Sequence, residues 1–213
     1  MQPPPPASPQ PPAPLTIERL QPFATPIFRL RLPGFEAWNG ALKAGILARR
    51  AADAGVLRSN RSGWHSADDA HLWDDAAMRE LCVATGRALV GALGNHYPAA
   101  GKLEAQLAMC WANVNTEGGW NVPHQHSSFP WVGSYYVDLG APEEHLGGIS
   151  FINPLAGANT FWQPQQFTLE PQAGELLIFP GSMLHYVHPN PAAAPRVSVA
   201  FNFQVKAARQ PWA

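Results

Sequence analysis

The sequence predicts an α+β protein, in which a sandwich or jelly roll of short strands is covered on one face by N-terminal helices. Two segments before residue 100 have apolar residues at helical spacing. From about residue 105 the apolar period shortens to two, β-branched and aromatic residues become frequent, and turn residues recur. Helices followed by a run of strands favour this architecture over the strand–helix alternation of a parallel sheet.

Length and composition indicate one domain behind an unusual N-terminal tail. Residues 1–14, MQPPPPASPQPPAP, contain eight prolines and no charge, and proline fits neither a helix interior nor a central strand. We therefore expect a disordered or polyproline-like tail over 1–14 and a single domain over 15–213. Because 46% of the residues are hydrophobic, the chain can bury a sizeable core.

The first half of the domain predicts one strand, two helices and a loop. Residues 25–34 alternate apolar and polar side chains, which is typical of a strand with one exposed face. Helical spacing predicts helices within 35–55 and 76–97, and residues 59–69, SNRSGWHSADD, are expected to form a loop between them. Helical support for the sheet is thus expected at about 35–100.

Six short segments with the composition of strands follow, within an expected β core at about 105–206. They are residues 107–114, 131–139, 148–153, 166–171, 174–181 and 196–205. Their number and the spacing of the turns between them fit a sandwich or jelly roll.

Charge and hydropathy exclude several classes of partner. The net charge is −1 and no basic stripe is present, so nucleic acid is not an expected partner. No window of 18 apolar residues predicts a membrane span, and no basic and apolar leader predicts secretion. Cys82 and Cys110 are expected to be reduced core thiols of a cytoplasmic protein. The low charged fraction, 14%, leaves room for a homodimer face.

Three histidines have a pattern that indicates a metal site. His124 and His126, in WNVPHQHSSFPW, would point to the same side if this stretch is an extended strand. Imidazoles placed in this way can bind one cation, and His185 is the best source of a third ligand because it follows a strand that breaks at a Pro-Gly pair. His188 is the alternative, and two hydrogen-bonded histidines without a metal are an equally simple interpretation of the pair alone.

The last predicted strand carries a candidate anion site. In RVSVAFNFQV one face is apolar, and the other begins with Arg196 and Ser198. The apolar face can pack on the helices, and the polar face then looks into solvent or into a barrel interior. A guanidinium and a hydroxyl two residues apart suit a carboxylate, because the guanidinium binds it with two hydrogen bonds and the hydroxyl adds another.

The order of these residues resembles the iron(II)- and 2-oxoglutarate-dependent oxygenases. His124 precedes His185 by 61 residues, and Arg196 follows His185 by 11. The segments FATPIF, SNRSGWHS, HQHSSFPWVGSYYVD, GELLIFPGSMLHYV and RVSVAFNF are similar to a bacterial group of these oxygenases over residues 20–205. The resemblance implies a double-stranded β-helix, a jelly roll, and a dioxygenase that hydroxylates a substrate with release of succinate and CO₂.

The resemblance also implies cofactors and residue roles. His124, His126 and His185 would be the catalytic ligands of Fe(II). Arg196 and Ser198 would bind the distal carboxylate of 2-oxoglutarate, as would the hydroxyl of Tyr136, which matches a tyrosine of the prolyl-hydroxylase-like branch. Asn113 would sit on the strand that enters the same site. Expected partners are O₂ and a small-molecule or peptide substrate.

One departure from the family pattern leaves the metal open. The family's usual motif has a carboxylate where this chain has His126, and three imidazoles with an open position also describe zinc in a cupin-like hydrolase or isomerase. Asp138 is a weaker candidate for the carboxylate. A non-catalytic β-sandwich binding module is the third interpretation, and it needs no metal.

The primary substrate is not indicated by the sequence. Trp64 and His65 could line the mouth of the pocket, as could Trp73, Phe161 and Trp162, although each aromatic residue is equally compatible with core packing.

Overall fold

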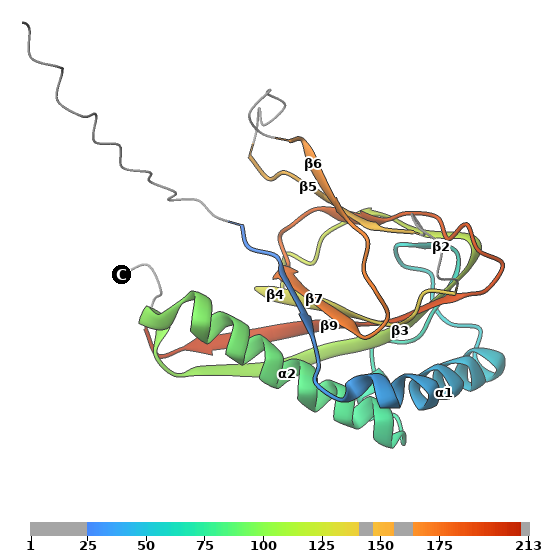
Figure 1. The fold of residues 1–213 in the computed structure, drawn as a ribbon, viewed down its shortest axis with the longest axis horizontal. Coiled ribbons are helices and arrows are strands. Elements are labelled where there is room, and N and C mark those ends of the chain that lie inside the picture. The colour runs from blue at the N-terminus through green and yellow to red at the C-terminus, as the bar shows by residue number, and fades with distance from the viewer. Residues whose placement is uncertain (1–24, 141–146, 156–163, 210–213) are drawn as a thin grey trace, which may run out of the picture.

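The structure, a computed structural model, describes residues 25–140, 147–155 and 164–209 (Figure 1). The predicted proline-rich tail over 1–14 lies outside these residues. The helices are α1 (Asn39–Ala52) and α2 (Ala76–His96), with one-turn 3₁₀ segments at Phe35–Trp38, Ala70–Leu72 and Pro98–Ala100. The strands are β1 (Phe28–Arg31), β2 (Asn60–His65), β3 (Leu103–His124), β4 (Trp131–Asp138), β5 (Ile149–Ile152), β6 (Gln166–Leu169), β7 (Glu175–Pro180), β8 (His185–Val187) and β9 (Arg196–Ala207).

The strands form one curled antiparallel sheet. Its order is β1-β7-β4-β9-β3-β8-β5-β6, and β2 pairs with β3 beside this path. The long strand β3 pairs first with β9, over Leu103–Asn115, and then with β2 and β8 near its end. Because of this change of partner, β3 belongs both to the layer over the helices and to the opposite layer of β8, β5 and β6 (Figure 1).

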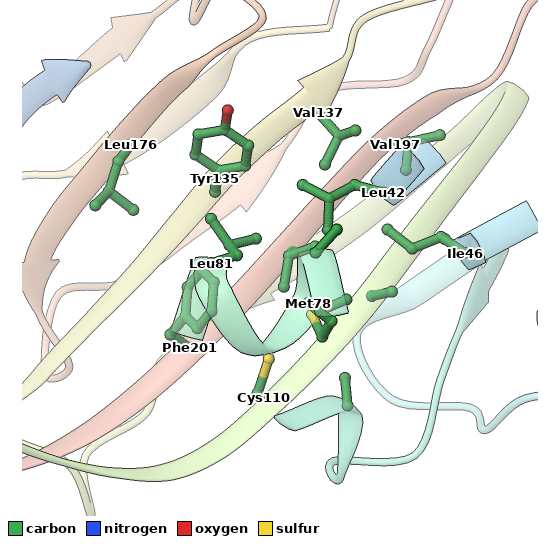
Figure 2. Packing of buried hydrophobic residues seen from close by; sticks show 14 of the residues in the cluster. Leu42, Ile46, Met78, Leu81, Cys110, Tyr135, Val137, Leu176, Val197 and Phe201 are labelled. Atoms are coloured by element: carbon green, nitrogen blue, oxygen red, sulfur yellow. The ribbon is translucent and has the colours of Figure 1, made fainter. Parts of the chain in front are cut away.

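Both helices pack on the outer face of the layer that contains β3, β9, β4 and β7, as predicted (Figure 1). Asp75 is the N-cap of helix α2, and its side chain accepts a hydrogen bond from the backbone N–H of Met78 at 2.9 Å. Leu42 and Ile46 of α1 and Leu81 of α2 are buried against the sheet (Figure 2). The apolar face of β9, which includes Val197, Val199, Phe201 and Phe203, belongs to the same core.

Replacing Leu81 by alanine is expected to lower the free energy of unfolding by about 2–5 kcal/mol, because Leu81 is completely buried and its loss leaves a cavity. Urea denaturation checks this value. Leu57→Ala is the matched control, since the Leu57 side chain is 74% exposed and should change stability by less than about 0.5 kcal/mol. Equal effects of the two substitutions would contradict the described packing.

The loop prediction for 59–69 is wrong over its first half, because Asn60–His65 form strand β2. This strand pairs antiparallel with β3, with a register shift between Arg61 and Gly63. The sequence there is polar and lacks a regular alternation, so its local pattern does not indicate a strand. The pairing depends on β3, which lies far away in sequence and supplies the backbone partners.

The two cysteines lie close together at the interface of α2 and β3. Cys82 and Cys110 are both free thiols, and their sulfur atoms are 3.9 Å apart. Burial raises the pKa of the Cys110 thiol well above its usual value. None of the described helices is long and apolar enough to cross a lipid bilayer.

Candidate metal centre

Three imidazole rings meet inside the curled sheet. His124 is the last residue of β3, His185 is the first residue of β8, and the two are paired directly in the antiparallel register. Candidate ligand nitrogens of His124, His126 and His185 all lie within 4.8 Å of one another. The fold therefore brings together the three predicted histidines, from segments 61 residues apart in the sequence.

His126 reaches this cluster differently from the prediction. Strand β3 ends at His124, so the two histidines do not share one extended strand. The N–H of His126 donates to the carbonyl of Gly181 at 2.7 Å, and its own carbonyl accepts from the N–H of Phe129 at 2.9 Å. Gly181 is required for this approach, because a Cβ there would collide with the carbonyl oxygens of His126 and Phe129. A turn, rather than strand alternation, directs the second ring to the centre.

Backbone carbonyl groups orient the other two rings. Nδ1 of His124 lies 2.7 Å from the carbonyl oxygen of Val122, and Nδ1 of His185 lies 2.9 Å from that of Met183. A carbonyl can only accept, so each Nδ1 carries the proton and each Nε2 keeps its lone pair. This is the usual arrangement of histidines that bind a metal through Nε2.

The three rings are neutral at pH 7. Burial, together with repulsion from His124, lowers the pKa of His185 to about 3 and that of His126 to about 4. Burial also lowers the pKa of His124. Because a protonated imidazole cannot bind a metal, these shifts keep all three nitrogens available as ligands at neutral pH.

Arg196 is a buried guanidinium in the same cavity. Its residue is 3% exposed, and it donates hydrogen bonds to the carbonyls of Gly147 and, at 3.1 Å, His188. Over residues 25–140, 147–155 and 164–209, no acidic side chain lies within ion-pair distance of it. Burial lowers its pKa to about 10, which still leaves Arg196 charged at pH 7. A buried charge without a counter-ion is energetically costly, so an anionic ligand would be stabilised next to Arg196.

The other predicted site residues line this cavity too. Ser198 pairs with Asn113 of β3 on one side and with Tyr136 of β4 on the other. All three border the cavity with Arg196 and the histidines. Burial raises the pKa of Tyr136 to about 12, so its hydroxyl remains a hydrogen-bond donor.

Several alternative candidates lie elsewhere. Asp138 forms an ion pair with Lys43 at 2.6 Å and is not part of the histidine cluster. His188 points its Nε2 to the hydroxyl of Ser150, at 2.7 Å, so it is not the third ligand. Trp73 is packed in the core against the helices.

The segment SGWHS contributes packing next to the site. Trp64 belongs to the core, and its indole N–H donates to the carbonyl of Asp53 at 2.8 Å. His65 stacks on Trp111, with ring centroids 5.4 Å apart, and Trp111 in turn lies 5.6 Å from His126. Phe161 and Trp162 lie outside the described residues.

The sequence did not single out a group of asparagines that borders the same cavity. Asn115 and Asn202 are buried, and within the described ranges their carboxamide oxygens, like that of Asn113, have no hydrogen-bond partner. The alternation of β9 places Asn202 on the face of Arg196 and Ser198, so a signal was present. The strand pattern alone could not show that its carboxamide oxygen is unpaired.

The curled antiparallel sheet with helices on one outer face defines a double-stranded β-helix, and three histidines in its interior define a metal-binding class within that fold. A prolyl-4-hydroxylase from Pseudomonas putida superposes with a TM-score of 0.58, at 17% identity, over 84% of this chain and 91% of its own. A prolyl hydroxylase from Trichoplax adhaerens, in complex with a hypoxia-inducible-factor peptide fragment, has a TM-score of 0.61 at 12% identity. That match covers 84% of this chain and 83% of the other. These likenesses confirm the predicted fold.

A family model described as "Putative 2OG-Fe(II) oxygenase" matches residues 109–202. The matched segment contains all three histidines, Arg196 and Ser198. Over this segment the chain is similar to the 2-oxoglutarate- and iron(II)-dependent oxygenases, in agreement with its motif order. HygX from Streptomyces hygroscopicus, solved with nickel and 2-oxoglutarate bound, has the same fold, with a TM-score of 0.58 at 11% identity over 84% of this chain and 82% of its own. None of the curated proteins matches the sequence.

Proposed function

We propose that His124, His126 and His185 bind the iron(II) ion and that Arg196 binds the distal carboxylate of 2-oxoglutarate, in a dioxygenase that hydroxylates a small molecule or peptide. The observation that carries this assignment is the position of Arg196. Its guanidinium is buried, borders the cavity of the three histidines, and has no acidic partner among the described residues.

The donor set fits a divalent metal. Three neutral imidazoles within 4.8 Å of one another supply three nitrogen ligands and leave further positions for a chelating cosubstrate. They also leave the full charge of the ion uncompensated, whereas the carboxylate usual in this family would remove one unit. That charge, added to Arg196, makes the cavity attractive to a dianion.

The remaining polar residues fit the cosubstrate. Ser198 and Tyr136 offer hydroxyl donors beside Arg196, and the carboxamide of Asn113, which pairs with Ser198, has an NH₂ group that can donate. A zinc hydrolase would have no use for this arrangement, and a binding module without metal would have none for the histidine cluster. Both alternatives leave the buried guanidinium of Arg196 without a function.

Iron and 2-oxoglutarate, when bound, supply the oxidation of a substrate by O₂ with release of succinate and CO₂. The chain itself positions the diacid and the metal-binding imidazoles, and it excludes water from the cavity. Arg196 fixes the orientation of the diacid, and the backbone carbonyls of Val122 and Met183 hold two of the imidazoles. Ile149, Phe179 and Val187 form an apolar part of the wall, which limits the access of water to the metal.

Succinate formation tests the proposal. Purified protein with Fe(II), ascorbate and 2-oxoglutarate under air is expected to release succinate even without a primary substrate, because uncoupled turnover needs only the metal and the cosubstrate. The same protein loaded with Zn(II) should release none. No succinate above the Zn(II) level, with a metal bound, would contradict the assignment, and hydrolytic activity with zinc would favour the cupin-like alternative.

A further inference from the structure

Asn202 is a buried polar side chain with one weak hydrogen-bond partner in the described part of the chain. It lies on β9, is 2% exposed, and borders the cavity of the three histidines. Its Nδ2 contacts the thioether sulfur of Met109 at 3.7 Å, and a thioether is a weak acceptor. Its Oδ1 has no hydrogen-bond partner among the residues that the structure describes. A buried carbonyl oxygen left without a donor costs about 1–3 kcal/mol, so a ligand that supplies the donor would gain affinity.

Asn202 lies far along β9 from Arg196, the residue proposed to bind 2-oxoglutarate. The part of the cavity beside Arg196 is called the cosubstrate end. Asn202 follows Arg196 by six positions, which is about 20 Å along the strand. The guanidinium of Arg196 reaches the carbonyls of Gly147 and His188, which flank β5 and β8. A five-carbon diacid held at Arg196 is too short to span this distance.

The metal centre lies between these two ends. Trp111, whose ring is 5.6 Å from that of His126, pairs with Ala200 on β9, one inward-facing position from Asn202. Asn113 and Asn115 pair instead with Ser198 and Arg196, and therefore belong to the cosubstrate end. Asn202 is left for the molecule that approaches the metal from the other side.

The charges of the cavity restrict what this molecule can offer. No aspartate or glutamate is among the described residues that border the cavity, and Arg196 is the charged side chain there. A cationic donor would lack compensation next to a divalent ion and a guanidinium. A neutral N–H or O–H group meets the Asn202 oxygen without this cost.

We propose that Asn202 is a specificity-determining residue that binds the primary substrate by accepting a hydrogen bond from a neutral amide N–H or hydroxyl group. This inference rests on the proposed function for the position of the metal and the cosubstrate.

The test uses a probe pair that differs in the donor alone. N-methylacetamide and methyl acetate have the same size and the same carbonyl, but only the amide has an N–H. With Mn(II) and 2-oxoglutarate bound, the paramagnetic broadening of the probes' methyl signals in proton NMR reports their residence beside the metal. We expect strong broadening of N-methylacetamide and several-fold less of methyl acetate.

The variant Asn202→Leu keeps the side-chain volume and removes the polar atoms. We expect it to reduce the broadening of N-methylacetamide to the level of methyl acetate, while 2-oxoglutarate binds within about twofold of the unaltered protein. Equal broadening of the two probes, no broadening of either, or an unchanged amide signal in the variant would overturn the inference. If the variant does not fold, the difference in broadening between the two probes on the unaltered protein still tests the inference.

Failure of the proposed function has a different signature. In that case the signals of 2-oxoglutarate itself are not broadened by Mn(II) in the unaltered protein. A protein that binds the cosubstrate but shows no preference for the amide contradicts the role of Asn202 alone.

Discussion

Replacing His185 by alanine is expected to abolish stoichiometric iron binding. The ring is almost completely buried, its Nδ1 is held by the Met183 carbonyl, and its other nitrogen is one of three that meet in the cavity. Loss of an outer-sphere partner already weakens metal sites about 10–100-fold, so loss of a direct ligand should weaken this one by at least about 100-fold. An anaerobic Fe(II) titration followed by elemental analysis measures the effect.

His188→Ala is the matched control for this experiment. His188 is three residues further along the chain, and its ring bonds to Ser150 rather than joining the cluster. We expect this variant to bind iron as the unaltered protein does, with a loss of stability of about 1 kcal/mol from the missing hydrogen bond. Iron retained by His185→Ala but lost by His188→Ala would reverse the assignment of the third ligand.

Arg196→Leu is expected to raise the dissociation constant of 2-oxoglutarate by about 30- to 1000-fold. A buried guanidinium paired with a carboxylate contributes about 2–4 kcal/mol to binding when the pair is shielded from water, and each 1.4 kcal/mol is a factor of ten. Iron affinity should change far less, because Arg196 is not a ligand. Calorimetric titration of 2-oxoglutarate into Mn(II)-loaded protein under nitrogen measures the first quantity, and the anaerobic Fe(II) titration measures the second.

Arg61→Leu is the control for the effect of net charge on 2-oxoglutarate binding. Arg61 also donates to backbone carbonyls, those of Arg58 and Asn60, but it is exposed on β2. Its replacement should leave the affinity for 2-oxoglutarate unchanged within about twofold, because an exposed charge is screened by water and salt. A similar loss in both variants would show that net charge, and not the buried position of Arg196, determines cosubstrate binding.

The sequence predicted most of the fold because its periodicities are long and regular. Strand β9 alternates over its whole length, so its apolar face and the inward position of Arg196 and Ser198 followed from the pattern. Helix α2 has both a capping aspartate and apolar spacing. The three histidines could be chosen because two of them are one residue apart and the third follows a strand that breaks at Pro180-Gly181.

What could not be predicted depends on contacts between distant segments. Strand β2 has no alternation of its own and forms because β3 offers an edge. The direction of the His126 ring is set by hydrogen bonds to Gly181 and Phe129, which strand geometry does not describe. The unpaired oxygen of Asn202 becomes evident only when its neighbours on β3 and β4 are in place.

The continuous course of β3 has a consequence for how the protein tolerates change. Strand β3 contains Cys110 and Val114 in the core beneath the helices and ends at His124, one of the three clustered histidines. Substitutions that disturb the packing under α2 therefore act on the strand that carries His124. Substitutions in the helical layer should consequently weaken metal binding as well as lower the stability of the fold.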